Sequence, residues 1–547
     1  MLRRGWIVIL VAALLCVGLL PSGALADGEV LIANSADLVK AIAGQANGQT
    51  WVFTNAGTYD ALNTGNGYYP YGANREFVFP IYADNLTIKK ADGVGEVVVT
   101  SSARPSETAG GNWHYQNFIT IFGRNVSIDG VTLQPNRNDY YGTCNKAIEL
   151  CAPGTDLHLS NIKILPLKNQ EGTSFGGSIY INGNNEDGTA RNIGTVTISN
   201  VTMDAWLSAS TVSQGNVVVT NLTQDFSNSE YAGYTYQGSY GWNPNITGTN
   251  VSVSGHTIIV DGKTNLNEQV FNANLRDGAT IKLSGDVQID KMLDITKNNI
   301  TLDLNGHTIT ASADFKSSYA NDSHLLNVTG DGVTIKNGTL KTTGKNKHAL
   351  NLYEAKNVTL ENMTLDHTNA SAGAPLVLNG SDALVKGKLT MNTGAKSWYA
   401  VNVDSKATGS ATLEFGPGSS IAFQGQSKLG IMVENNAPNG HVSVVFDPNV
   451  EIECPDEFIP LHNEADSGVE VEDPENAGLV QHGDEWVLEE SEPTPTPTTQ
   501  PTPAPAPQQP PKTGDSSHLA LWMVLLVLSL GCGCCLLIKK NNRADNR

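Results

Sequence analysis

Residues 195–204 read TVTISNVTMD, and residues 216–225 read NVVVTNLTQD. In both stretches apolar and polar residues alternate, an asparagine occupies the sixth position, and the alternation then resumes. Alternation of this kind is typical of short β-strands that bury one face. The phrase returns at residues 357–366 as NVTLENMTLD, so one short structural unit repeats along the chain.

The repeat predicts a stack of coils. Most successive copies start roughly 21 to 40 residues apart, a scatter that solenoids tolerate because insertions fall in loops. One coil cannot bury its apolar face alone, whereas coils stacked about 4.8 Å apart share a continuous core and pair their strands in parallel. The other copies start at Asn85, Asn125, Asp156, Asn299, Gly332 and Ala383.

Asparagines separate the two strand halves of many copies. Asparagine tolerates the left-handed backbone that a corner requires. Amides that stack from coil to coil can also bond to one another, as side-chain ladders do. The asparagines expected at corners are Asn161, Asn200, Asn221, Asn337 and Asn362.

This pattern resembles the right-handed parallel β-helix of the pectin-lyase-like superfold. The resemblance covers most of residues 50–450, and the stretch 303–309, DLNGHTI, looks like a coil found in many bacterial surface β-helix proteins. It implies an all-β solenoid. An array of antiparallel sandwiches is the alternative, which the scarcity of hairpin turn signals disfavours.

Two helical signals interrupt the repeats. Residues 35–43 open with Ser35 as the expected capping residue, and residues 265–275 repeat the helical spacing. Helices that cover the open ends of a solenoid would have this form. We therefore expect two stacked β-helical units, 27–255 and 256–490; one long solenoid with an insertion is the alternative.

The composition excludes several classes of protein. The chain has 547 residues, a formal net charge of -20 and 16% charged residues, against about 25% in typical domains. This balance argues against a helical bundle, a coiled coil and an ordinary cytosolic enzyme. The excess of acids argues against binding to nucleic acid, because phosphates would be repelled.

The N-terminus has the form of a secretory signal peptide, residues 1–26. Arg3 and Arg4 precede an apolar run at 7–20, and Ala24-Leu25-Ala26 supplies the small residues that signal peptidase needs. The run is short for a membrane span, although an N-terminal membrane anchor is the alternative.

The C-terminus combines four features. Residues 491–511 form a proline-rich linker that favours extended polyproline II. Residues 510–514 read PPKTG, and residues 519–538 are apolar for the length of a membrane span. Lys539 and Lys540 begin a basic tail of the kind that stays on the cytoplasmic side.

This order resembles the cell-wall sorting signal of Gram-positive surface proteins, here residues 510–547, with a PPKTG variant of the LPxTG motif. Pro511, Thr513 and Gly514 match the motif, and Pro510 stands where leucine is commonest. The resemblance implies that a sortase cuts after Thr513 and joins it to peptidoglycan, so the chain would contact the membrane only before sorting. A plain single-pass membrane protein is the alternative.

Three cysteines lie between the two terminal signals. Cys144 and Cys151 could close a small disulfide loop in an oxidising compartment, which would leave Cys454 as an odd thiol. Their spacing matches no zinc motif.

Aromatic residues gather in a stretch rich in Gly, Ser and Asn. Such side chains can stack on sugar rings and bond their hydroxyls, so they are candidate ligand-binding residues. Packing over the side of the solenoid is the alternative. These residues are Tyr231, Tyr234, Tyr236, Tyr240 and Trp242.

Aligned repeats place Asp204 and Asp225 on adjacent coils, about 5 Å apart. Two acids at this spacing could bind calcium or form the acid and nucleophile pair of a retaining glycosidase. Lys163 lies on the same face and could serve as the base of a pectate-lyase-like enzyme. Solvated turn acids and an ordinary exposed face are the alternatives.

We expect a cell-wall-anchored, extracellular surface protein that binds glycans or another surface ligand without turning them over. No cofactor is expected, calcium apart. A polysaccharide lyase or glycoside hydrolase on the same scaffold is the rival, and a plain stalk is a third reading. Fold alone cannot separate them.

Overall fold

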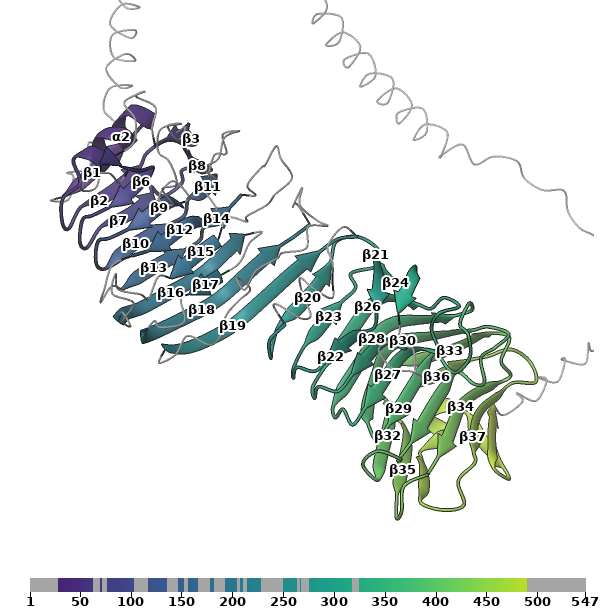
Figure 1. The fold of residues 1–547 in the computed structure, drawn as a ribbon. Helices are drawn as coiled ribbons and strands as arrows, with labels where there is room; N and C mark the ends of the chain where they lie inside the picture. The colour runs from purple at the N-terminus through teal and green to yellow at the C-terminus, as the bar shows by residue number, and fades with distance from the viewer. Residues whose placement is uncertain are drawn as a thin grey trace, which may run out of the picture. The chain divides into compact units, whose positions relative to one another are not determined.

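Short strands, most of them paired in parallel, make up most of the described residues between 28 and 488 (Figure 1). The computed structural model describes residues 28–61, 69–70, 76–102, 117–134, 146–151, 156–165, 178–181, 192–203, 207–209, 214–227, 249–262, 266, 275–316 and 324–488.

The largest sheet, called here the long sheet, has 24 strands. They are β1 (Glu29–Ile32), β2 (Thr50–Phe53), β3 (Gly57–Asp60), β7 (Thr87–Lys90), β8 (Val97–Thr100), β10 (Val126–Asp129), β11 (Thr132–Gln134), β13 (Leu157–Ser160), β14 (Lys163–Ile164), β16 (Asn192–Met203), β18 (Gln214–Asp225), β19 (Thr249–Val260), β20 (Thr280–Leu283), β21 (Val287–Lys291), β23 (Thr301–Asp303), β24 (Thr308–Lys316), β26 (Thr334–Lys341), β28 (Val358–His367), β30 (Asp382–Thr393), β32 (Ser410–Phe415), β33 (Ser420–Gly425), β35 (His441–Phe446), β36 (Glu451–Glu453) and β38 (Val469–Glu472).

Two further sheets close the coils. The five-stranded sheet contains β6 (Phe79–Ile81), β9 (Asn117–Ile121), β12 (Lys146–Leu150), β15 (Ser178–Ile181) and β17 (Leu207–Ala209). The nine-stranded sheet contains β22 (Leu293–Ile295), β25 (His324–Val328), β27 (His348–Tyr353), β29 (Leu376–Asn379), β31 (Val401–Asp404), β34 (Leu429–Glu434), β37 (Ile459–Asn463), β39 (Leu479–His482) and β40 (Glu485–Leu488). The remaining elements are the antiparallel pair β4 (Tyr69–Pro70) and β5 (Glu76–Phe77), helix α2 (Ser35–Ala43) and the 3₁₀ helix η3 (Pro474–Ala477).

The alternation seen in the sequence decides which side chains enter the core. Ile128, Leu159, Ile198 and Val219 are register partners on successive coils, and all four are buried. Because polar neighbours on the same strands face outward, each coil completes the apolar column of the next. This arrangement confirms the predicted parallel β-helix and excludes an array of antiparallel sandwiches.

The corner asparagines adopt the predicted left-handed backbone, with φ between 52° and 59° at Asn161, Asn200, Asn221, Asn337 and Asn362. Their amides form the expected ladder. Nδ2 of Asn221 donates to Oδ1 of Asn200 at 3.1 Å, and Nδ2 of Asn200 donates to Oδ1 of Asn161 at 3.1 Å. These bonds therefore hold the corners of adjacent coils in register.

Replacing Asn200 with alanine should lower the free energy of unfolding by about 2 kcal/mol. Roughly half comes from forcing a Cβ-bearing residue without a local hydrogen bond into a left-handed conformation, and the rest from the two lost ladder bonds. Asn200→Gly is the matched control, because glycine keeps the backbone and loses only the ladder. Chemical denaturation that finds glycine as damaging as alanine would contradict the backbone argument.

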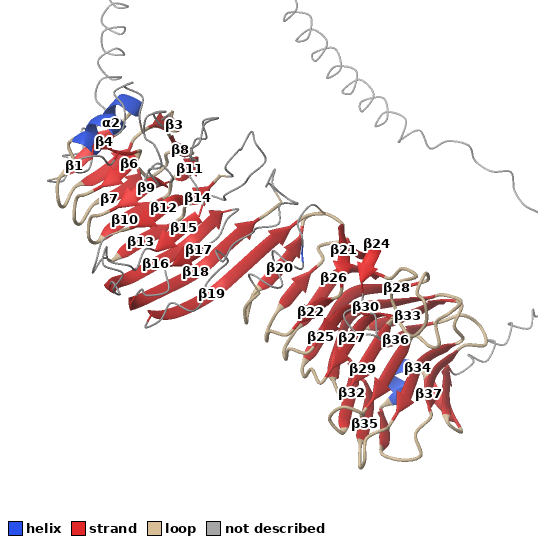
Figure 2. Cartoon of the chain, viewed as in Figure 1, coloured by secondary structure: helices blue, strands red, loops and turns tan. Residues whose placement is uncertain are grey.

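Helix α2 covers the first coils, as predicted (Figure 2). Its cap is Asn34 rather than the expected Ser35: Asn34 has extended backbone, and its Oδ1 accepts from the Asp37 amide at 3.1 Å. Ser35 lies inside the helix, where its Oγ accepts from the Asp60 amide and so ties the helix to β3. Of the second predicted helix, 265–275, the structure describes only Leu266 and Leu275, both buried.

The repeat shifts its frame at β19. Residues 249–254 of β19 pair only with β18, whereas in its second half residues 256–259 pair with β18 on one side and residues 257–260 pair with β20 on the other. Each coil contributes a first and a second strand to the long sheet. Up to β19, one row of paired strands is made of second strands. After β19, the same row continues with the first strands of the following coils. The apolar core divides at the same place, into one cluster from Ile32 to Leu222 and another from Phe226 to Trp486.

A polar pair occupies the core where the two clusters meet. His256 and Gln224 are buried, and Nε2 of His256 lies 2.7 Å from Oε1 of Gln224. Burial, with the charge of Arg276 nearby, lowers the pKa of His256 to about 4. The imidazole is therefore neutral at physiological pH.

Candidate functional site

In the second half of the solenoid, successive loops leave the long sheet at one edge. Leu340, Leu365, Met391 and Phe423 are register partners near the ends of β26, β28, β30 and β33. The loops that follow these strands cross to the nine-stranded sheet, whose strands are again in register. The loops 342–347, 368–375, 394–400 and 426–428 therefore stack along this edge.

Trp398 is the most exposed large apolar side chain on this edge, with 54% of its surface accessible. Its amide donates to the carbonyl of Gly373 at 2.8 Å, and its carbonyl accepts from Oγ of Ser427 at 3.4 Å. These partners belong to the loops on either side, so the backbone of Trp398 is held while its indole stays open to solvent.

One lysine contacts Trp398, and others lie in the stacked loops beside it. Nζ of Lys347 lies 5.3 Å from the centre of the indole ring, a cation–π contact. Lys396 is exposed in the same loop as Trp398, and Lys428 follows Ser427 in the next loop. We call Lys345, Lys347, Lys396, Trp398 and Lys428 the loop-edge patch.

Buried histidines support the patch from below. Nε2 of His367 lies 2.7 Å from the carbonyl oxygen of Lys347, and its Nδ1 lies 2.8 Å from Oγ of Ser397. A carbonyl can only accept, so Nε2 carries the hydrogen and Nδ1 accepts from the serine hydroxyl. Burial lowers the pKa of His367, which keeps this neutral form.

His348 lies beside this support. Its ring is 5.2 Å from that of His324 on the neighbouring coil, and its Nδ1 is 3.1 Å from the Ala374 amide nitrogen. Burial, and next the charge of His324, lowers the pKa of His348 to about 3. A side chain at Gly373 would collide with the imidazole, because a Cβ there would lie 2.6 Å from Cε1. The loop that receives the Trp398 hydrogen bond is thus packed against His348.

Carboxylates line another part of the nine-stranded sheet. Asp404 and Glu434 are register partners, and Oε2 of Glu434 accepts from Nδ2 of Asn402 at 2.7 Å. Burial, together with the charges of Glu434, Asp404 and Glu464, raises the pKa of Tyr399. The phenol therefore stays protonated at neutral pH and can donate a hydrogen bond, but it is a poor general base.

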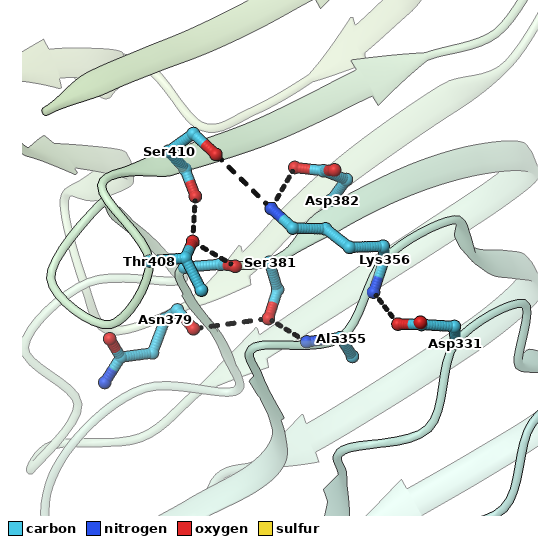
Figure 3. Close-up of polar contacts among 9 residues, drawn as sticks. Asp331, Ala355, Lys356, Asn379, Ser381, Asp382, Thr408 and Ser410 are labelled. Atoms are coloured by element: carbon cyan, nitrogen blue, oxygen red, sulfur yellow. Dashed lines mark hydrogen bonds and ion pairs between the residues drawn. The ribbon is translucent and has the colours of Figure 1, made fainter.

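Figure 3 shows a polar network at the corner after β27. Nζ of Lys356 lies 3.2 Å from Oδ1 of Asp382 and 3.4 Å from Oγ of Ser410, and its amide donates to Oδ1 of Asp331 at 2.8 Å. Because Asp331, Lys356, Asp382 and Ser410 belong to four successive coils, Lys356 fastens the stack. We assign this network to the fold rather than to a ligand.

The structure places part of the predicted acid and lysine set. Lys163 is exposed on β14, with Thr132 and Thr202 as its register partners. Asp225 ends β18, where its Oδ1 accepts from the amide of Ser227 at 3.0 Å and from its Oγ at 2.6 Å. Asp204 lies outside the described residues, so the proximity of the two acids and calcium binding there stay predictions.

Other predicted site residues also fall outside the described part. Cys151 is described and half-buried, whereas Cys144 is not described, and the disulfide stays a prediction. Cys454 is a free thiol whose pKa burial raises, with Asp456 adding to the effect. The residues outside are Tyr231, Tyr234, Tyr236, Tyr240, Trp242, Pro511, Thr513 and Gly514.

Two features are absent from the described residues. No group of three or more His, Cys, Asp or Glu side chains there is placed to hold a metal ion. Nor does any helix among them combine the length and apolar character that a membrane crossing needs. The apolar stretch 519–538 lies outside the described residues.

The loop-edge patch was not predicted from the sequence. Its signal lies just beyond the repeats, where the segments 343–347, 393–398 and 425–428 each place lysine after glycine at a strand end. Aligning the repeats through their loops, rather than only through their strands, would have brought these lysines together.

Known structures match the chain at low similarity. The A-module of the Azotobacter vinelandii mannuronan C-5 epimerase AlgE6 matches with 13% identity and a TM-score of 0.25, over 82% of this chain and 97% of that one. An alginate lyase from Paenibacillus sp. str. FPU-7 matches with 11% identity and a TM-score of 0.18, over 81% of this chain and all of the other. No protein-family model and no curated protein matches the chain.

Proposed function

We propose that this chain is an exported, cell-wall-anchored surface protein whose β-helix binds glycans, or another ligand of a host surface, without turning them over. The loop-edge patch is the contact site in the described part of the chain. The observation that carries this proposal is an exposed indole, Trp398, whose backbone is fixed by the loops on both sides.

A fixed aromatic ring suits sugar binding. Indole offers a flat apolar face to the C–H groups of a sugar ring, and a backbone held in advance loses little conformational entropy on binding. Neighbouring lysines can donate hydrogen bonds to hydroxyl and acidic groups. Stacked loops along one edge would present such contacts to an extended polymer.

Binding without turnover agrees with the chemistry of the described side chains. Tyr399 stays protonated, and Asp225 uses its Oδ1 within a local turn. The rival reading, a polysaccharide lyase or hydrolase, requires Asp204, Asp225 and Lys163 to act together. Incubation with pectins, glycosaminoglycans and host glycans separates the two, since new unsaturated uronates or reducing ends would establish turnover.

Trp398→Ala should weaken glycan binding at least tenfold, which corresponds to about 1.4 kcal/mol. The loss is expected because alanine removes the stacking face and leaves the backbone bonds. Tyr353→Ala is the matched control: Tyr353 is 42% exposed and lies at the far end of its strand in the same sheet. Titration calorimetry that finds equal affinity for Trp398→Ala and the parent protein would remove the patch from the proposal.

Anchoring has its own test. Thr513→Ala should move the protein from the wall fraction to the membrane and medium, because Thr513 would carry the bond to peptidoglycan. Thr502→Ala, in the proline-rich linker, is the control and should leave the protein in the wall. Mass spectrometry of wall digests should find Thr513 joined to a peptidoglycan fragment; wall retention of the Thr513 variant would refute sorting at this motif.

A further inference from the structure

The loops that carry the loop-edge patch are basic, although the chain has a net charge of -20. Segments 342–347, 368–375, 394–400 and 426–428 contain four lysines and neither aspartate nor glutamate. The next loop, 454–458, supplies two acids, Asp456 and Glu457, and the Glu457 carboxylate lies 3.3 Å from Nζ of Lys428. The stacking of coils thus concentrates positive charge at one edge of an acidic protein, where it attracts anions.

The lysines are distributed along the stack. Lys345 and Lys347 precede β27, whereas Lys396 precedes β31, two strands further along the sheet. Parallel strands about 4.8 Å apart place these two loops about 10 Å apart. Positive charge therefore recurs along the direction in which an extended polymer would lie across the coils.

The patch joins charge to an aromatic face at a fixed place. His367 holds the carbonyl of Lys347, and the ammonium group of Lys347 lies against the indole of Trp398. Both ends of this lysine are thereby tied to the patch. The compact ammonium charge is suited to an anionic group, and the adjacent ring is suited to the sugar that bears it.

We propose that the loop-edge patch selects anionic polysaccharides, in which the lysines bind sulfate or carboxylate groups and Trp398 stacks on the sugar ring. The proposal rests on the glycan binding proposed above and names the chemical class of the ligand. Neutral polymers of the same backbone would keep the stacking and lose the ionic contacts.

Two matched pairs of polymers test the charge directly with the full-length protein. Polygalacturonate and its methyl ester differ in the carboxylate charge, and dextran sulfate and dextran differ in sulfate. At low salt, at least one charged polymer should bind at least tenfold more tightly than its neutral partner, and added salt should reduce the difference. The pair that responds identifies the acidic group.

Two triple variants with the same net charge test the location. The patch variant should lose most of the preference for the charged polymer, and the control should keep it. Circular dichroism and thermal unfolding check that both are folded. The patch variant is Lys345→Gln, Lys396→Gln and Lys428→Gln, and the control is Lys297→Gln, Lys386→Gln and Lys406→Gln.

The possible outcomes distinguish the preference for anionic polysaccharides from glycan binding as such. If neutral and charged partners bind equally and Trp398→Ala weakens both, glycan binding stands and the anionic preference is wrong. A preference that both triple variants keep would also overturn the inference. If inorganic polyphosphate binds as tightly as the sugars, and Trp398→Ala does not change its affinity, the patch recognises negative charge without the sugar. That result would also overturn the inference. Failure of every polymer to bind would end both proposals.

Discussion

Phe446→Ala is expected to lower the free energy of unfolding by about 3–5 kcal/mol, the usual cost of removing a buried phenylalanine. Phe446 and Phe415 have no accessible surface, and their rings stack 5.2 Å apart with an angle of 5° between planes. Alanine would leave a void against Phe415, and the neighbouring coils can close it only partly because strand register fixes their positions.

A graded series makes this expectation specific. Phe446→Leu should cost markedly less than alanine, because it removes less volume from the same column. Val480→Ala, at a side chain that is 39% exposed, is the surface control and should cost well under 1 kcal/mol. Urea unfolding monitored by circular dichroism measures the free energy of unfolding of all three variants. Equal losses of stability for Phe446→Ala and Val480→Ala would show that the stack of Phe415 and Phe446 does not stabilise the core.

Lowering the pH from 7.5 to 5 should destabilise the fold by about 2 kcal/mol for each of two buried histidines. Burial lowers the pKa of His348 to about 3 and that of His256 to about 4. In the unfolded chain both imidazoles take a proton near pH 6.5. Below that pH the unfolded state binds more protons, so stability is complete above about 6.5 and falls as the pH drops.

The double variant His256→Gln, His348→Gln should remove most of this acid sensitivity, although it costs some stability at neutral pH. His441→Gln is the control, since that side chain is 57% exposed. Denaturation midpoints across pH 4.5–8 give the slopes. A double variant as acid-sensitive as the parent protein would assign the effect to other groups.

Much of the fold was predictable because the sequence patterns that determine it lie within short segments. Alternation at Val196 and Ile198 sets the buried face, and asparagines such as Asn200 mark corners that few other residues can occupy. The helix over residues 35–43 was also predicted, but its cap was not. Asn34 and Ser35 are both good caps, and only the tertiary contact between Ser35 and the Asp60 amide decides between them.

The candidate site was not predictable in the same way. Lys347 and Trp398 lie 51 positions apart in sequence and meet because the four strands between them, β27 to β30, have definite lengths and register. A repeat pattern defines what each strand buries, whereas the loops carry no comparable periodic signal. The pairing of Lys163 with Thr202 followed the alignment because both lie on strands.

The frame shift at β19 has a mechanical consequence. Pulling along the stack loads the strands at right angles to their length, so their hydrogen bonds are peeled one after another rather than sheared together. β18 and β19 share ten register pairs, whereas β19 and β20 share four. Under tension, the described part of the chain should therefore separate first between β19 and β20. Each half would then keep its own apolar core.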